Sequence, residues 1–242
     1  MTATIIDRSV PQAGSPAMVG ATTVEPSPYA WVERLGRYRL LSTKYYLLAK
    51  RAMDVAICLA VLPLLLPLFG VIALMIKIQS PGAPAVFTQY RTGRHGKRFK
   101  IYKFRTMVAN AEEMKLQLLH LNELQWPDFK ITNDPRVTKI GKFLRKTSLD
   151  ELPQIFNILK GEMSFVGPRP TSFAASTYRL WQTERLDVIP GLTGLWQVYG
   201  RAETEFDERL RQDIAYIQNR SLLFDIVIIF LTAGSVFMAR GK

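Results

Sequence analysis

Two adjacent carboxylates, Asp150 and Glu151, lie in a stretch that also carries a proline and is surrounded by lysines and arginines. Pro153 has no backbone N–H and fits best in a first helical turn, which predicts that a helix begins near Leu149. A helix N-terminus favours anions, so Asp150 would stay ionised as a nucleophile beside a phosphate or a metal. Glu151, about 100° further round the helix, could bind a divalent cation. The pair therefore predicts phosphate chemistry.

The same residues also have an ordinary structural interpretation. Ser148 and Glu151 have the spacing of a capping box, and acidic residues are common in any first helical turn. The spacing alone favours this structural role. The chemical role gains support from the glycine, arginine and two prolines that follow closely at residues 167–170, and from the many basic residues nearby.

The composition predicts a folded protein with an anionic partner. The chain has 242 residues, 48% of them hydrophobic, which is ample for a core, and a formal net charge of +12. That charge suits nucleic acid, an acidic membrane surface or phosphorylated small molecules. Cys58 is the only cysteine, so no intramolecular disulfide can form and we expect cytoplasmic exposure. The sequence has no metal-spaced His or Cys cluster, no Walker phosphate loop, no dinucleotide fingerprint and no evident Ser-His-Asp set.

Residues 55–76 form an uncharged run that is long enough, as a helix, to cross a bilayer core of ~30 Å. Pro63 and Pro67 lie within the run and predict a kink or break. Basic residues flank both sides, so both ends are expected to face the cytoplasm. We therefore predict a re-entrant, monotopic helix-break-helix over residues 49–82, with a single-pass anchor as the alternative. Residues 1–48, rich in Pro, Ser, Thr and Ala, lack a signal-peptide core and predict a variable, flexible leader.

Residues 83–242 are predicted to form one cytoplasmic α+β domain that is mainly helical. Seven basic residues lie from Arg91 to Arg105 with no acid among them, and two glycines mark a turn. We therefore expect a short β-hairpin whose second strand includes residues 99–104. Apolar spacing and composition predict three further helices, over residues 107–125, 203–219 and 222–238. The last is short for a membrane span, so it is expected to lie on the membrane or to pack against the core.

These motifs, taken together and in order, resemble the bacterial sugar transferases that are monotopic phosphoglycosyl transferases, and most of all the short enzymes that initiate exopolysaccharides with galactosyl or glucosyl phosphate. The likeness extends from Lys50 to the C-terminus. It is carried by residues 50–54 (KRAMD), 80–82 (SPG), 102–107 (YKFRTM), 144–154 (LRKTSLDELPQ), 161–170 (GEMSFVGPRP) and 190–201 (PGLTGLWQVYGR). One departure is that the family's membrane break is usually Ser-Pro, whereas here Leu66 precedes Pro67.

The resemblance implies a two-step reaction. Asp150 would attack the β-phosphorus of a UDP-sugar and expel UMP, and polyprenyl (undecaprenyl) phosphate would then accept the phosphosugar. Splitting a transfer between two phosphate anions in this way fits covalent catalysis by a carboxylate, and the anionic transition states need cations. Glu151 matches the family position that helps to hold Mg²⁺, with Asp150 nearby.

The resemblance also implies binding roles for other residues. Arg145 and Arg169 match family residues near the phosphates, and Pro168 and Pro170 would form a rigid shelf for the nucleotide base. Further positions that match family motifs and are expected at the substrate site are Lys50, Arg51, Asp54, Lys103, Arg105, Gln197, Arg201 and Asp213. Ordinary alternatives remain for some of them: Lys50, Arg51 and Asp54 could be a charge cluster at a helix start, and Asp213 could lie on a solvated helix face.

The expected partners are a UDP-sugar donor, polyprenyl phosphate and lipids of the bacterial inner membrane, on its cytoplasmic face, with no nucleic acid. The residues do not specify the sugar, the polymer or the oligomeric state, and a homodimer is compatible with them. Two other classes are weighed against the enzyme: a membrane-tethered nucleic-acid-binding protein, which leaves the two carboxylates without a role, and a structural membrane scaffold.

Overall fold

The structure is a computed structural model that describes residues 32, 42–123, 129–199 and 205–237. It is mainly helical, with one small antiparallel hairpin and one long apolar helix, as the sequence predicts. Most of the predicted leader, residues 1–48, lies outside the described residues, and so does Arg201.

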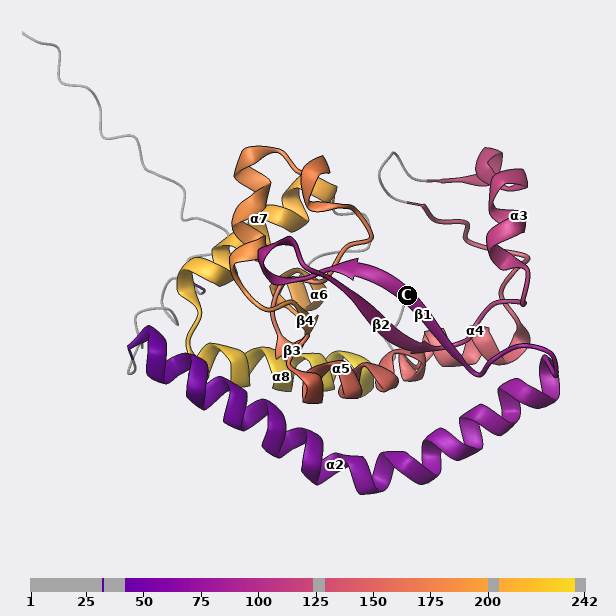
Figure 1. The fold of residues 1–242 in the computed structure, drawn as a ribbon, viewed down its shortest axis with the longest axis horizontal. Helices are drawn as coiled ribbons and strands as arrows, with labels where there is room; N and C mark the ends of the chain where they lie inside the picture. The colour runs from indigo at the N-terminus through magenta and orange to yellow at the C-terminus, as the bar shows by residue number, and fades with distance from the viewer. Residues whose placement is uncertain (1–31, 33–41, 124–128, 200–204, 238–242) are drawn as a thin grey trace, which may run out of the picture.

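The long apolar helix, α2 (Thr43–Gln79), is bent like a shallow V whose apex points away from the rest of the protein (Figure 1). Pro63 and Pro67 both lie inside it. Because they are four residues apart, the two missing N–H groups fall on one face of the helix, where the lost hydrogen bonds allow a bend. The sequence predicted a kink or break at these prolines: the structure shows a bend, and the helix continues through it without the break that a helix-break-helix requires.

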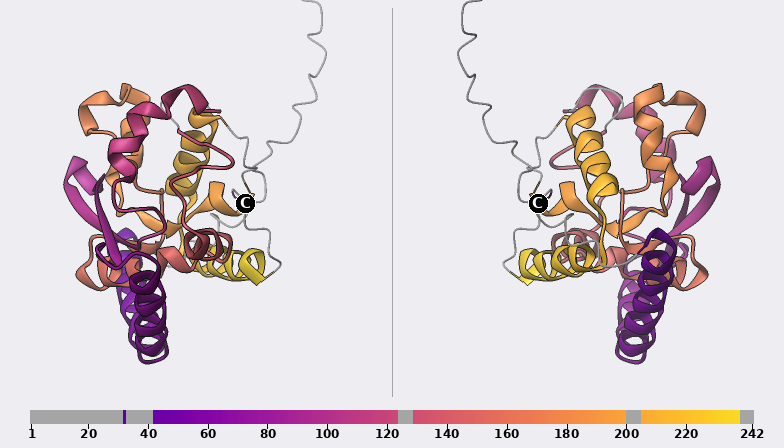
Figure 2. Two further views of the ribbon diagram at one scale, coloured as in Figure 1. Left: turned by 90° about the vertical axis from the view of Figure 1, so that its right-hand side faces the viewer. Right: turned by 90° about the vertical axis from the view of Figure 1, so that its left-hand side faces the viewer.

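The rest of the protein lies on one side of α2. Helices α4 (Lys139–Lys146), α5 (Ile155–Lys160) and α8 (Leu222–Phe237) form a row above the bend, and the side views of Figure 2 show α2 protruding below this row. Among the described residues, α2 is the one helix long and apolar enough to cross a membrane, judged by length and composition. Its outer surface is apolar and open: Leu64, for example, is 76% exposed.

The predicted hairpin is confirmed. Strands β1 (Val86–Thr92) and β2 (Arg98–Phe104) pair antiparallel, with Val86 opposite Phe104 and Thr92 opposite Arg98. The turn between them contains η1 (Arg94–Gly96). Alternate β2 residues, Phe99 and Ile101, are buried. They pack with Ile155 and Ile158 of α5 and with Cys58 of α2, so one apolar cluster joins the hairpin, α5 and α2.

The helix predicted over residues 107–125 is wrong in extent. The structure has α3 (Ala111–Gln117) followed by η2 (Leu119–Leu121), while Met107 pairs with Val137 in an isolated bridge. After η2 the chain turns back on itself, since the Glu123 N–H donates to the Lys130 carbonyl at 2.9 Å. At both ends of the predicted helix, hydrogen bonds to residues further along the chain therefore replace the helix that the apolar spacing of residues 107–125 predicted.

The C-terminal half contains a second, smaller sheet. Strands β3 (Ser164–Val166) and β4 (Gly191–Thr193) are parallel, and the chain between them forms η4 (Ala175–Thr177) and η5 (Leu180–Asp187). Helices α6 (Leu195–Tyr199) and α7 (Phe206–Asn219) follow. The last helix, α8, packs against the core: Phe224 and Ile228 are fully buried, while Phe230 is 73% exposed.

Candidate active site

The two carboxylates lie at the start of η3 (Leu149–Gln154), a short helix that continues directly into α5. Ser148 has a left-handed backbone (φ 57°), and this turn separates α4 from η3. The predicted helix start near Leu149 is confirmed. Within the described part of the chain Ser148 makes no side-chain capping bond, and the Glu151 carboxylate points instead to cations on other segments. The capping-box interpretation of these residues is therefore wrong.

Glu151 joins three segments. Its Oε1 accepts a hydrogen bond from Lys103 Nζ of β2 at 2.6 Å, and the Arg169 guanidinium binds both carboxylate oxygens, with Nη1 3.1 Å from Oε2. Burial raises the pKa of Glu151, but Arg169 and then Lys103 lower it more, so its pKa lies well below the usual range. Glu151 is therefore a fixed anion that holds two cations in place.

Asp150 has a different environment. Burial raises its pKa above the usual value and the charge of Glu151 adds to this, while Lys103 and Arg145 oppose it. Arg145 is held by a 2.9 Å bond from its Nε to Thr106 Oγ1. Asp150 is thus a partly desolvated carboxylate among cations, which suits a nucleophile better than a permanent ion-pair partner.

Close backbone contacts set the loop that carries Arg169. A Cβ on Gly167 would lie 2.6 Å from the Ile189 carbonyl, and one on Gly191 would lie 2.1 Å from the Gly167 nitrogen, so only glycine fits at either position. The Gly191 N–H donates to the Pro168 carbonyl at 2.9 Å. These contacts fix the loop from which Arg169 reaches the Glu151 carboxylate.

Asp213 lies behind this loop. Its Oδ2 accepts a hydrogen bond from Arg185 Nη2 at 2.7 Å, and the same nitrogen donates to the Arg169 carbonyl at 2.6 Å. Both side chains are almost fully buried, and burial raises the pKa of Asp213 to about 6 against the pull of Arg185. Asp213 is buried and so does not lie on a solvated helix face; through Arg185 it supports the Arg169 loop from within.

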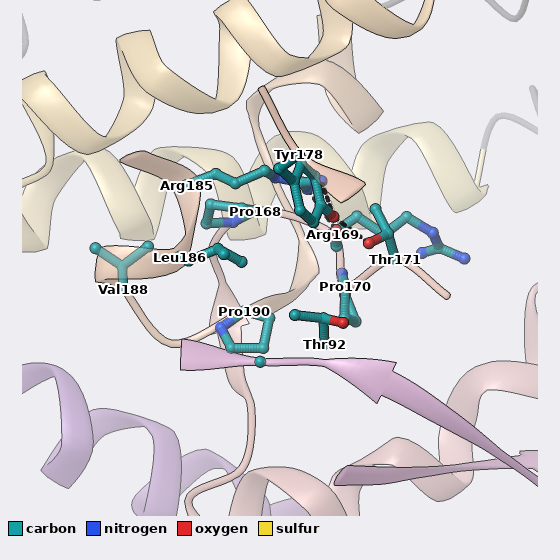
Figure 3. Close-up of a pocket in the computed structure, with 11 residues that line it drawn as sticks. Thr92, Pro168, Arg169, Pro170, Thr171, Tyr178, Arg185, Leu186, Val188 and Pro190 are labelled. Atoms are coloured by element: carbon teal, nitrogen blue, oxygen red, sulfur yellow. Dashed lines mark hydrogen bonds between the residues drawn. The ribbon is translucent and has the colours of Figure 1, made fainter. Parts of the chain in front are cut away.

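A small pocket opens on the other side of the loop. Its walls include Thr92 and Gly93 at the end of β1, the rings of Pro168, Pro170 and Pro190, and the side chains of Tyr178 and Arg185 (Figure 3). The Arg185 guanidinium lies 6.0 Å from the centre of the Tyr178 ring. Pro168 and Pro170 therefore line a concave surface, and their role as a shelf for a nucleotide base stays a prediction.

The three charged residues at the start of α2 make contacts inside the protein. Lys50 Nζ donates to Asp225 of α8 at 2.9 Å, and Asp54 accepts from the Phe165 N–H at 3.2 Å. Arg51 donates to the carbonyls of Ile158 and Leu159, at 2.5 and 2.7 Å. These residues hold α2 to α8, β3 and the end of α5.

Asp225 is the centre of a buried polar network. Besides Lys50, it accepts hydrogen bonds from Tyr46 Oη at 2.9 Å and from Tyr216 Oη at 2.6 Å, and it is fully buried. The network links α2, α7 and α8. In the sequence, Asp225 is the one charged residue in the apolar segment 222–237, and nothing there indicates its partners.

Two other predicted substrate residues, Arg105 and Gln197, contact backbone carbonyls. Arg105 Nε donates to the Pro84 carbonyl at 2.8 Å, and the Arg105 guanidinium lies over the Phe87 ring. Gln197 Nε2 donates to the Leu192 carbonyl at 3.0 Å, and its Oε1 is buried with no hydrogen-bond partner among the described residues.

Sequence reasoning missed two basic residues near the site. Arg185 was not singled out, and Arg91 was counted only as part of a basic run. Arg91 projects toward Arg169 and Glu151, and burial, then Arg169, lower its pKa to about 10. Alternation along β1 was an available signal, since Arg91 shares a face with the half-buried Phe87 and Gln89.

The donor set fits a magnesium ion bound mostly by substrate. Among the described residues no group of three or more His, Cys, Asp or Glu could hold a metal. Mg²⁺, however, commonly uses one or two protein carboxylates plus phosphate oxygens. A carboxylate has about four acceptor positions, and Lys103 and Arg169 take three of those on Glu151, which leaves one on Oε2. Asp150 would provide the second carboxylate.

Comparison with known proteins agrees with these motifs. The family described as Bacterial sugar transferase matches residues 45–239. Galactosyl transferase CpsE of Streptococcus agalactiae is 46% identical over 84% of this chain and 46% of its own length. Undecaprenyl-phosphate galactose phosphotransferase of Salmonella typhimurium is 45% identical over 79% of this chain and 41% of its own length. This chain therefore spans less than half the length of either relative. Exopolysaccharide production protein ExoY of Rhizobium meliloti is 38% identical over 93% of this chain and all of its own length.

Proposed function

Since this chain belongs to the bacterial sugar transferase family, we propose that it transfers a sugar 1-phosphate from a UDP-hexose to polyprenyl phosphate. The observation that carries the proposal is the meeting of Lys103, Arg145 and Arg169 around two adjacent carboxylates. Two relatives are named as undecaprenyl-phosphate phosphotransferases of galactose and glucose, which supports this reaction class and these sugars.

In the first step Asp150 attacks the β-phosphorus of the donor. A bond forms between a carboxylate oxygen and phosphorus, the bond from that phosphorus to the bridging oxygen breaks, and UMP leaves with the electron pair. Burial favours this step, because a desolvated carboxylate loses less hydration when it reacts. Lys103, Arg145 and Arg169 neutralise charge that develops on the phosphate oxygens.

In the second step a phosphate oxygen of the polyprenyl acceptor attacks the same phosphorus. The ester to Asp150 breaks, the carboxylate is regenerated and the lipid diphosphate sugar forms. Mg²⁺, when bound by Glu151 Oε2 and Asp150, would supply further neutralisation of the diphosphate. The fixed charge of Glu151 holds Arg169 and Lys103 toward the reacting phosphorus.

The lipid acceptor requires a site at a membrane, and α2 supports this. The helix is apolar and bent, and both its ends lie on the side of the protein that carries the site (Figure 1). We infer that α2 enters one leaflet and returns, so that the site lies on the side of the membrane where both ends of the helix emerge. The basic residues that flank the apolar run favour the cytoplasmic face of the inner membrane as that side. Cysteines introduced at Thr43 and Gln79 in a Cys58→Ala background test this: a membrane-impermeant reagent should reach both from the same side, and access from opposite sides would refute re-entrance.

The nucleophile is tested with the purified protein in detergent. We expect Mg²⁺-dependent UMP release from UDP-galactose or UDP-glucose when polyprenyl phosphate is added, and a trapped phosphosugar adduct on Asp150 by mass spectrometry. Asp150→Asn should abolish both results, whereas Asp187→Asn, a matched change at an exposed carboxylate, should retain them. Turnover by Asp150→Asn, or an adduct on another residue, would contradict the assignment. No UMP release from any of a panel of UDP-sugars would favour the scaffold alternative.

A further inference from the structure

Asn157 has no role in the reaction described above, yet it binds the backbone of β2 next to Lys103 from the side of the protein core. It lies in α5, six residues after Glu151, and is fully buried. Its Oδ1 accepts a hydrogen bond from the Tyr102 N–H at 3.1 Å, and its Nδ2 donates to the Lys100 carbonyl at 2.7 Å and to Glu162 Oε2 at 2.7 Å.

The first two bonds have the pattern of a β-ladder. In an antiparallel pair, alternate residues direct their N–H and C=O groups away from the partner strand, and a third strand would normally bind them. On β2 the Lys100 C=O and the Tyr102 N–H are two such groups, one on either side of Ile101. The carboxamide of Asn157 supplies the acceptor and the donor that a peptide group of a third strand would supply.

This contact lies next to the ion pair at the carboxylates. Lys103 directly follows Tyr102 on β2, and its Nζ lies 2.6 Å from Glu151 Oε1. The Asn157 bonds and the Lys103–Glu151 pair therefore join the same two segments, β2 and η3–α5, at neighbouring points. Any shift of β2 along α5 that breaks the first contact also moves the second.

Apolar packing does not fix that position by itself. Ile101 packs with Ile155 and Ile158, and such contacts have no strong directional preference, so they tolerate a displacement along the helix. Two hydrogen bonds to one carboxamide do not tolerate such a displacement, because hydrogen bonds weaken steeply as their distance and angle change. Buried polar groups are well suited to this selection of one arrangement over similar ones.

We propose that Asn157 is a positioning residue that sets the place of Lys103 relative to Asp150 and Glu151. It acts through β2 and touches no reacting atom. The inference rests on the proposed function, because it concerns the rate of that reaction. A misplacement of about 1 Å can cost on the order of 100-fold in rate, so the effect on kcat should be large.

The test is a double-mutant cycle in UMP release with Asn157→Ala, Lys103→Met and the double variant. Asn157→Ala should lower kcat by roughly 10- to 100-fold, with a smaller change in KM. Because it acts through Lys103, the double variant should be no more than about twofold slower than the slower single variant. If the two losses multiply, Asn157 does not act through Lys103 and the proposal is overturned.

A matched control separates this role from a general loss of stability. Asn219→Ala removes a carboxamide bond to the Ala215 carbonyl in α7, and its effect on kcat should combine independently with that of Lys103→Met. If Asn157→Ala does not fold, Asn157→Ser takes its place in the cycle with the same expected coupling.

Amide hydrogen exchange provides a readout that needs no turnover. Asn157→Ala should speed exchange at the Tyr102 N–H, and unchanged exchange there would overturn the proposal whatever the activity. Wild-type protein that releases no UMP would instead count against the proposed function. The two failures are therefore distinguishable.

Discussion

The buried network around Asp225 should contribute strongly to stability, and Asp225→Asn tests how much. The substitution keeps the shape and one carbonyl acceptor for the tyrosines but removes the charge opposite Lys50, whose side chain is only 11% exposed. Breaking a buried pair in this way costs about 3 to 5 kcal/mol, because an ammonium group is left buried without a counter-ion. For a protein of this size each kcal/mol lowers Tm by about 2 to 4 °C, so a decrease of about 6 to 20 °C is expected.

The assay is thermal unfolding in detergent, followed by circular dichroism, with Lys50→Met and the double variant alongside. The double variant should recover at least about half of the loss, since it removes both charges while the amide still accepts from a tyrosine hydroxyl. Asp207→Asn is the matched control: Asp207 and Arg179 form an exposed pair at 4.0 Å, whose loss should cost less than about 1 kcal/mol. A decrease below about 2 °C for Asp225→Asn, or a double variant no more stable than that single one, would refute the reasoning.

Two further predictions concern packing and pH. Gly141→Ala should lower Tm markedly, because its Cβ would lie 2.0 Å from the Thr106 carbonyl; Gly82→Ala, with nothing within 4 Å, should have little effect, and equal effects in thermal unfolding would contradict this. Asp213 has a raised pKa of about 6, so the folded protein keeps a proton that the unfolded chain releases from about pH 4. The stabilisation that this bound proton gives the folded protein is complete below pH 4 and is lost as pH rises through 6. The free energy of unfolding of the wild type, relative to that of Asp213→Asn, should therefore fall by about 3 kcal/mol across that window. Denaturant titrations at several pH values measure it, and a flat or rising difference would show that Asp213 does not titrate in this way.

Local signals predicted the parts of the site that depend on neighbouring residues. The hairpin follows from two glycines between two strand-like segments, and the start of η3 follows from Pro153. The motifs located the two carboxylates and Arg169, and the structure brings them together. Short-range geometry was sufficient for these features.

Contacts between distant residues were not predictable in the same way. Lys50 and Arg51 were expected at the substrate site or as part of a charge cluster at a helix start, and the structure shows Asp225 and the end of α5 as their partners. Nothing in the spacing of residues 50 and 225 indicates that they touch. The parallel pairing of β3 with β4 likewise depends on two glycines whose backbones meet only after the chain folds, and the role of Asn157 needs β2 beside α5.

The separation of Lys50 from Asp225 has a consequence for how the protein is made. The two residues are 175 positions apart in the chain. At a ribosomal speed of about 5 to 20 residues per second, Asp225 is synthesised about 10 to 35 s after Lys50. During that interval the start of α2 has no partner for its ammonium group in α8. The packing of α2 against α8 must therefore be completed late in translation or after it.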